Sequence, residues 1–336
     1  MKIGIELEYW VINQEGKLVS SKKLAENTDS AEQEFVEPLI EVKTSPSSSI
    51  ESLKNEIKGK LKKLFNSADS LDQNIVPLGT PLNSGKIEML ESKRGKIQSK
   101  IIGENLEAAK RVAGTHIHFE KKEVKQQLNT LTALDPALAL TNSSPYYQGE
   151  KTASSSRNRV YRYQCYQDFP EHGQLWNYTD SVQEWEERIE ENFQKFKNEA
   201  KTCNVSEKEL NKYFSAHDAL WAPIRLRKEF PTIEWRAPDS GRLQDTLRMA
   251  SEIKSIVEKG VERPEFEELQ NLSCESINRG LESSEVNSYL SECGFSVDKY
   301  NPISSEIDNN QSISIKQARE IRLKYAKELK KEIDNI

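Results

Sequence analysis

The chain has 336 residues, and its 48 Lys and Arg against 54 Asp and Glu give a net charge of −6. This acidic balance argues against a general binder of nucleic acids or anionic membranes, and no apolar run approaches the ~20 residues that cross a bilayer. The length suffices to bury a substantial core, and we expect a single catalytic domain over residues 1–336.

The cysteines and the N-terminus indicate the compartment. Cys165, Cys203, Cys274 and Cys293 are widely spaced and form no C-x-x-C pair. They are therefore expected to be reduced thiols of a cytoplasmic protein. Met1 leads directly into the first predicted strand, which leaves no room for a signal or transit peptide.

The first predicted elements are two strands with an apolar face and an acidic face. In residues 3–8, apolar residues alternate with polar ones, so that Glu6 and Glu8 project to the same side. Residues 39–43 repeat the pattern, with Glu41 on the polar side.

Three further segments lead to the middle of the chain. Apolar residues at three- and four-residue spacing predict a helix over 50–65. Residues 75–81 read as a buried strand that ends in a tight turn, and the charged stretch 86–112 is expected to be mostly helical.

The central segment contains two histidines on one strand face. Of the four histidines in the chain, His116 and His118 lie two residues apart in the predicted strand 114–119. A helix is expected over residues 123–140, with Pro136 marking a kink or boundary.

An irregular polar stretch follows over residues 142–159, and a long loop inside a compact domain is usually functional or disordered. The aromatic residues and arginines of this stretch favour a functional loop. Residues 185–196 form an amphipathic helix, and residues 232–236 a fourth strand that carries Glu234 and Arg236 on its polar face.

Helices are predicted over residues 245–259 and 315–333. We expect the segment 257–336 to be mostly helical and to serve either as a cap on the sheet or as an interaction arm. Strands and helices that do not alternate regularly indicate an α+β fold.

The polar faces of these strands predict a site for divalent cations. Each face alone could be the solvated side of an antiparallel sheet. Together they bring like charges onto one sheet, which is unfavourable unless a cation intervenes. Carboxylates with an imidazole suit Mg²⁺ or Mn²⁺ and match structural Zn²⁺ poorly. The candidate metal ligands are Glu6, Glu8, Glu41, His116 and Glu234.

Arginines beside such a cluster indicate phosphoryl transfer. If the polar faces converge, Arg225 and Arg236 lie next to the cations, where they can stabilise the charge of a moving phosphoryl group. The sequence contains no P-loop, no G-x-G-x-x-G and no kinase catalytic loop. A nucleotide would therefore be held through metals on the sheet.

Six short motifs resemble, in order and spacing, those of the glutamate–cysteine ligase family. The similarity is greatest to the branch of bacterial carboxylate–amine ligases and archaeal γ-glutamylcysteine synthetases, and it spans about residues 1–254. The resemblance implies a glutamine-synthetase-type domain, in which an antiparallel sheet curves into a funnel with helices on its outer side. The motifs lie at residues 4–8, 37–44, 114–118, 143–149, 222–225 and 232–236.

The resemblance also implies a reaction and roles for residues. ATP phosphorylates the γ-carboxylate of glutamate, and the amine of cysteine attacks the acyl phosphate, with Mg²⁺ or Mn²⁺ as the metal. By resemblance, the five candidate ligands match metal positions, and Glu34 falls where the family often has another acidic residue. Arg225 and Arg236 are the expected catalytic residues. The expected substrate-binding residues are Arg157, Tyr147 and Gln148.

Two alternatives to cysteine ligation stay open. The acceptor could be another amine, because residues 158–215 match no motif of the family. The chain could also be an inactive metal- or nucleotide-binding homologue, which is less favoured because every expected metal ligand and arginine is present. The expected partners are small-molecule substrates, with no nucleic acid and no membrane, and a homodimer is a further expectation.

Overall fold

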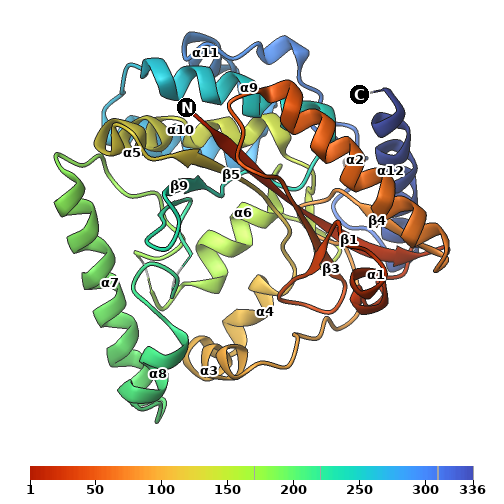
Figure 1. The fold of residues 1–336 in the computed structure, drawn as a ribbon, viewed down its shortest axis with the longest axis horizontal. Coiled ribbons are helices and arrows are strands. Elements are labelled where there is room, and N and C mark those ends of the chain that lie inside the picture. Colours follow the sequence, from red (N-terminus) through yellow and green to blue (C-terminus); the bar gives the residue numbers. More distant parts are fainter. Residues whose placement is uncertain (170, 220, 309, 336) are drawn as a thin grey trace.

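The computed structural model describes residues 1–169, 171–219, 221–308 and 310–335. Positions 309 and 336 of the predicted C-terminal helical segment, and position 170 of the unmatched stretch, lie outside the described residues. Within the described part, seven strands form a sheet with the order β2-β3-β1-β5-β9-β8, and β4 pairs with the far end of β1 (Figure 1).

All pairings in this sheet are antiparallel. The strands are β1 (Ile3–Asn13), β2 (Glu32–Gln33), β3 (Leu39–Lys43), β4 (Gln73–Val76), β5 (Thr115–Glu120), β8 (Ile224–Leu226) and β9 (Thr232–Trp235). A separate hairpin pairs β6 (Tyr146–Tyr147) with β7 (Glu150–Lys151). The mixed helix and antiparallel sheet confirms the predicted α+β class.

Helices lie on both sides of the sheet (Figure 1). One group contains α2 (Ile50–Asp69), α5 (Val124–Ala133), α9 (Leu243–Lys259), α10 (Phe266–Asn278), α11 (Ser284–Glu292) and α12 (Ile315–Asn335). The other contains α3 (Lys93–Ile102), α4 (Leu106–Ala109), α6 (Ser156–Val160), α7 (Val182–Thr202) and α8 (Glu207–Tyr213), and the short α1 (Lys22–Glu26) lies beside β2 and α2. None of the described helices is long and apolar enough to cross a bilayer.

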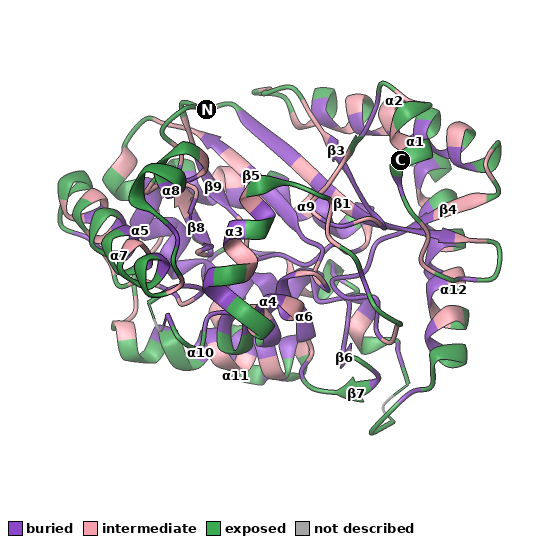
Figure 2. Ribbon diagram, turned by 90° about the horizontal axis from the view of Figure 1, so that it is seen from below, coloured by how far each residue is buried: buried purple, intermediate pink, exposed green. Residues whose placement is uncertain are grey.

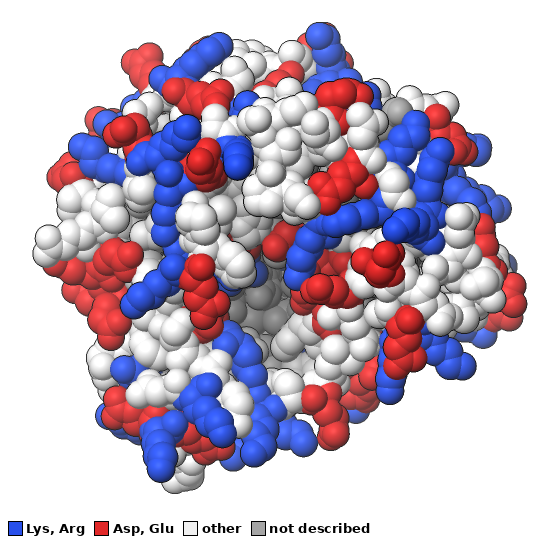
Figure 3. Space-filling model, viewed as in Figure 1, with Lys and Arg blue, Asp and Glu red and all other residues white. Residues whose placement is uncertain are grey.

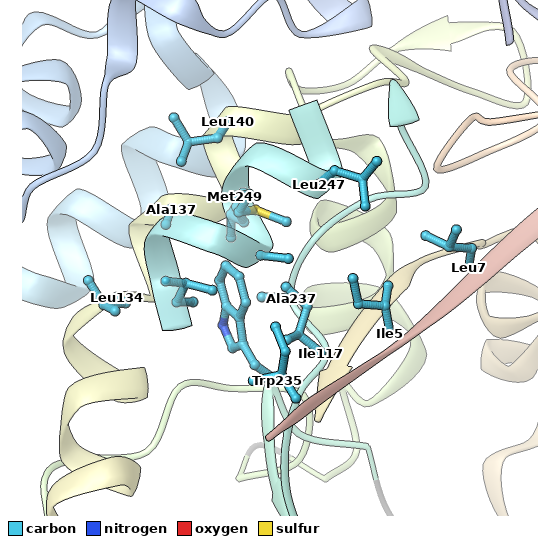
Figure 4. Packing of buried hydrophobic residues seen from close by; sticks show 14 of the residues in the cluster. Ile5, Leu7, Ile117, Leu134, Ala137, Leu140, Trp235, Ala237, Leu247 and Met249 are labelled. Carbon is cyan, nitrogen blue, oxygen red and sulfur yellow. The ribbon is translucent and has the colours of Figure 1, made fainter. Parts of the chain in front are cut away.

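The apolar face of the sheet packs against the first group of helices. Ile5 of β1, Ile117 of β5 and Trp235 of β9 lie on the side of the sheet that faces α9, in the same buried cluster as Met249 of that helix (Figure 4). Since side chains alternate along a strand, the burial of these residues directs the intervening polar residues to the opposite face. In Figure 2 the strands are mostly buried, whereas the outer helices are partly exposed.

The C-terminal helices belong to this core. Leu269 of α10 and Leu290 of α11 are fully buried in the same apolar cluster as β1. A buried ion pair ties the two sides together, with Arg162 Nη1 2.9 Å from Asp135 Oδ2, and Ser273 of α10 donates to the same carboxylate. These contacts fit a cap on the sheet, the first of the two predicted roles.

One predicted helix differs from the structure. The helix expected over 123–140 ends at Ala133 and continues as a 3₁₀ helix over Asp135–Thr141, because Pro136 cannot donate the next helical hydrogen bond. The stretch 86–112 is mostly helical, as predicted, with α3, α4 and a 3₁₀ turn between them.

The loop expected over residues 142–159 contains the β6–β7 hairpin and α6. Gln148 and Gly149 turn the hairpin, with φ of 51° and 89°. Ser155 Oγ accepts from Asn158 N and so caps the start of α6.

Candidate active site

The strand register places the predicted polar residues opposite one another. Residues that face each other in an antiparallel pair project to the same side of the sheet, so a continuous polar row crosses five strands. From β3 to β8, the facing pairs are Glu41–Glu8, Glu6–His116, His118–Glu234 and Glu234–Arg225. The predicted convergence of these faces is confirmed.

Glu6 lies at the centre of the row. Its Oε2 is 3.1 Å from His116 Nδ1, and its Oε1 is 3.2 Å from His118 Nε2. Burial opposes ionisation of Glu6, but hydrogen bonds with the two imidazoles outweigh it and lower the pKa of the carboxyl. Ligand atoms of Glu6, Glu41 and His116 lie within 4.8 Å of one another, as do those of Glu6, His118 and Glu234.

His118 is therefore a candidate ligand that was not among the five predicted. It lies two residues after His116 on the same strand, so alternation alone identified its face. Thr232 Oγ1 lies 3.3 Å from His118 Nδ1, and this contact leaves Nε2 directed at Glu6.

Three buried atoms of the cluster, namely Glu41 Oε2, His118 Nε2 and Glu234 Oε1, have only ion-pair partners within the described part of the chain. The ammonium group of Lys43 lies 2.5 Å from Glu41 Oε2 as an ion-pair partner. Likewise Glu6 Oε1 lies 3.2 Å from His118 Nε2, and Arg236 Nε lies 3.0 Å from Glu234 Oε1. Carboxylate oxygens and imidazole nitrogens this close together are ligand types that suit a divalent cation.

The acidic side of the cluster resists ionisation without a cation. Burial, reinforced by repulsion from Glu34, Glu6 and Glu8, raises the pKa of Glu41 to about 10. Burial likewise raises the pKa of Glu8, which accepts a hydrogen bond from Gly114 N at 2.5 Å. A bound divalent ion would reverse this tendency.

Glu234 is fully buried and surrounded by guanidinium groups. Its Oε2 is 2.6 Å from Arg225 Nη2 and 3.4 Å from Arg227 Nη1, and its Oε1 is 3.0 Å from Arg236 Nε. Although burial opposes it, the charges of Arg225 and Arg236 hold the pKa of Glu234 at about 2. Arg227 was not identified from the sequence, although it lies two residues after Arg225 and so on the same face.

Two cavities meet at this row, and Figure 3 shows that face of the molecule hollowed near its centre. The aromatic cavity, of about 280 Å³, is defined by Arg157, Tyr161, Tyr166 and Trp221. The acidic cavity, of about 510 Å³, is defined by Glu6, Glu41, His118, Arg227 and Phe230. Both cavities share the wall of Glu8, Glu34, His116, Arg225 and Arg236.

Arg157 is held against the end of β9. Its guanidinium donates to the backbone oxygens of Ala237 at 2.9 Å and Arg236 at 3.0 Å. A Cβ at Gly114 would lie 2.2 Å from Arg157 Nη2, so a larger residue at position 114 would displace the Arg157 guanidinium. Of the predicted substrate-binding residues, Arg157 thus lines the aromatic cavity.

Tyr147 and Gln148 do not line either of these cavities. They form the turn of the β6–β7 hairpin, where Gln148 is exposed. Two cavity residues that the sequence did not indicate are Tyr161 and Trp221, whose ring centroids lie 4.6 Å apart. Tyr161 lies in the stretch that matches no motif of the family, and Trp221 directly precedes the motif at residues 222–225.

Comparison with known proteins identifies a family and a shared fold. A family model described as glutamate-cysteine ligase family 2 (GCS2) matches residues 2–277. The fold is similar to that of a bifunctional glutathione synthetase from Pasteurella multocida, with a TM-score of 0.62 and 16% identity over 99% of this chain and 52% of that one. This chain therefore spans about half the length of that protein.

A second similar structure is glutamate–cysteine ligase from Francisella tularensis in complex with AMP. It gives a TM-score of 0.61 and 14% identity over 98% of this chain and 88% of that one. No curated protein sequence matches the chain.

Proposed function

Because the chain belongs to glutamate–cysteine ligase family 2, we propose that it joins the γ-carboxylate of glutamate to the amine of cysteine, with ATP converted to ADP and phosphate. The observation that carries this proposal is the meeting of carboxylates, imidazoles and arginines on one sheet face, between two cavities. Carboxylate-held cations beside arginines are the apparatus of phosphoryl transfer.

The two ligand groups that share Glu6 would hold Mg²⁺, with Mn²⁺ as the alternative. Carboxylate oxygens suit both ions, and the short separations between the ligand atoms of each group support this assignment. When bound, the cations would supply positive charge that offsets the charge of the phosphates of ATP.

Arg225 and Arg236 would bind the oxygens of the glutamate γ-carboxylate and of the transferring phosphoryl group. A guanidinium is planar and permanently charged, so it can bind two oxygens at once. Glu234 contacts both arginines and fixes their direction before the substrates bind. Preorganised donors of this kind stabilise developing charge without reorganisation.

The aromatic cavity would hold the amino-acid substrates. Its volume of about 280 Å³ is smaller than that of the acidic cavity, and Tyr161, Tyr166 and Trp221 place aromatic rings among its charged lining residues. An acyl phosphate reacts with water, so a site that excludes water favours attack by the amine. Arg157 would place a substrate carboxylate there, and the sheet with its two cavities would correspond to the funnel of a glutamine-synthetase-type domain.

The test is amine-dependent phosphate release. The protein is incubated with ATP, Mg²⁺, glutamate and cysteine, each component is omitted in turn, and ADP, phosphate and γ-glutamylcysteine are quantified. We expect all three products only in the complete mixture. A panel of other amines in place of cysteine tests the acceptor. Phosphate release that does not depend on glutamate, or no release with any amine, would overturn the proposal.

A further inference from the structure

Phe230 is an exposed aromatic residue on the wall of the acidic cavity. Its side chain lies in the turn between β8 and β9 and is 53% exposed. A single exposed apolar residue is common on protein surfaces and needs no explanation by itself. Phe230, however, lines the acidic cavity, together with Glu6, Glu41 and His118 of the two cation-ligand groups.

The turn that carries Phe230 is held in place from both sides. Phe230 O accepts from Thr232 N at 2.8 Å, and Thr232 O accepts from Arg227 N at 3.1 Å. Lys121, which follows β5, donates its backbone N–H to Pro231 O at 2.9 Å and its side-chain ammonium to Arg227 O. The ring is thus presented by a fixed backbone.

A guanidinium already stacks on this ring. Arg227 Cζ lies 4.9 Å from the ring centre of Phe230, and Arg227 Nη1 lies 3.4 Å from Glu234 Oε2. Arg227 therefore links the aromatic ring to the cation cluster. Lys43, on the same cavity wall, adds a second positive charge near the carboxylates.

We propose that Phe230, backed by Arg227, is the stacking platform for the base of a nucleotide whose phosphates lie at the cation cluster. The inference rests on the proposed function for the identity of the phosphate-bearing substrate. An aromatic face binds any base by stacking, and a cavity of about 510 Å³ is within the range of small-molecule sites. The acidic cavity then receives the nucleotide, and the aromatic cavity receives the amino acids.

The test separates the base from the phosphates. Binding of ATP and of inorganic tripolyphosphate is measured by calorimetry with Mg²⁺ and without amino acids, for the wild type and for Phe230→Ala. We expect the variant to lose about tenfold in affinity for ATP, because stacking on an aromatic residue is worth that much or more. Tripolyphosphate, which has no base, should bind the two proteins equally.

Tyr163 provides a matched control. It is 39% exposed and carries Arg159 Cζ at 5.2 Å from its ring centre, but it lines neither cavity. Tyr163→Ala should leave ATP binding unchanged. Phe230→Trp should retain it, and Phe230→Leu replaces the alanine variant if that variant does not fold.

The outcomes distinguish this inference from the proposed function. Equal loss of ATP and tripolyphosphate affinity, no loss of either, or no preference of the wild type for ATP would overturn the platform. If the wild type binds ATP in a Phe230-dependent manner but releases no phosphate with any amine, the platform stands and the ligase proposal fails.

Discussion

Arg225 and Glu234 face each other across the β8–β9 pair, and Arg225 Nη2 lies 2.6 Å from Glu234 Oε2. The carboxylate is fully buried, so its charge is matched inside the protein by guanidinium groups. Glu234 thus maintains the arginine cluster as well as offering a ligand atom to a cation. These two roles distinguish Glu234 from the other acidic residues of the row.

Glu234→Gln should therefore lower both turnover and stability. The substitution leaves the arginines around it without their buried counter-charge, and breaking a buried ion pair costs about 3 kcal/mol or more. Urea unfolding of the free protein and an ADP assay measure the two effects. Full stability of the variant would show that solvent, and not Glu234, compensates the arginines.

Glu41→Gln should have the opposite effect on the protein without cations. With a pKa of about 10, the buried Glu41 carboxyl must take up a proton on folding at neutral pH, so an uncharged isostere removes this cost and should leave the melting temperature in EDTA equal or higher. Saturating Mg²⁺ or Mn²⁺ should stabilise the wild type by about 2–3 kcal/mol and the variant by much less. Glu32→Gln is the control, because Glu32 is exposed and faces Glu41 across β2–β3. Equal stabilisation of both variants by cations would remove Glu41 from the ligand set.

His118→Ala tests the candidate cation ligand that was not among the five predicted from the sequence. If Nε2 binds a cation, Mn²⁺ affinity measured by calorimetry should fall by about tenfold or more, the scale seen when the support of a metal site is removed. His217→Ala is the matched change, since His217 Nε2 lies 2.9 Å from Glu186 of α7 and its carboxylate partner belongs to neither ligand group. Unchanged affinity in the His118 variant would contradict the assignment.

Arg236→Lys tests whether the reaction needs the planar guanidinium group of Arg236, which can bind two oxygens at once. Lysine retains the charge that Glu234 needs, so the melting temperature should hold, whereas kcat/KM for glutamate should fall by on the order of 100-fold through loss of a preorganised donor. Arg188→Lys, in the surface pair with Glu184, should change neither quantity. Wild-type kinetics in Arg236→Lys would remove Arg236 from the reaction.

The buried carboxyl of Asp245 gives a pH-dependent contribution to stability. Burial raises its pKa from 3.8 to about 6, so the folded state holds the proton more tightly, and stability is lost as pH rises between these values. The difference in unfolding free energy between wild type and Asp245→Asn should fall by about 2 kcal/mol from pH 4 to pH 6.5, because this interval covers most of the roughly two-unit shift. Asp298→Asn, at an exposed position, should run parallel to wild type. A constant difference for Asp245→Asn would refute the assignment.

The row of polar residues was predictable because it depends on strand alternation. Glu6, His116 and Glu234 each lie next to apolar neighbours in the chain, and this alternation assigns all three to the polar side of their strands. His118 and Arg227 share faces with recognised residues, so the same rule places them. The pairing of Glu6 with His116 was not predictable, because alternation within a strand does not determine the register between strands.

The aromatic cavity was not predictable for a physical reason. Tyr161 begins a short π-helical turn after α6 and Trp221 lies in an irregular segment far along the chain, and a cavity wall of this kind leaves no periodic signal. The short β8 was also missed, because its three residues are too few for alternation to appear. Conversely, Tyr147 and Gln148 were expected at the site from resemblance, whereas their hairpin turn lies outside both cavities.

The strand order has a consequence for synthesis on the ribosome. The central strand β1 meets β3, β4 and β5 early, but β9 joins β5 only after residues 224–235 have been translated. At about 5–20 residues per second, the edge of β5 stays open for on the order of ten seconds. During that interval Ile117 and Phe119 are not yet covered by β9, and an uncovered strand edge invites pairing with other chains. Nascent chains of this protein should therefore need chaperone protection until β9 emerges, and the ligand group that contains Glu234 is completed after that of Glu6, Glu41 and His116.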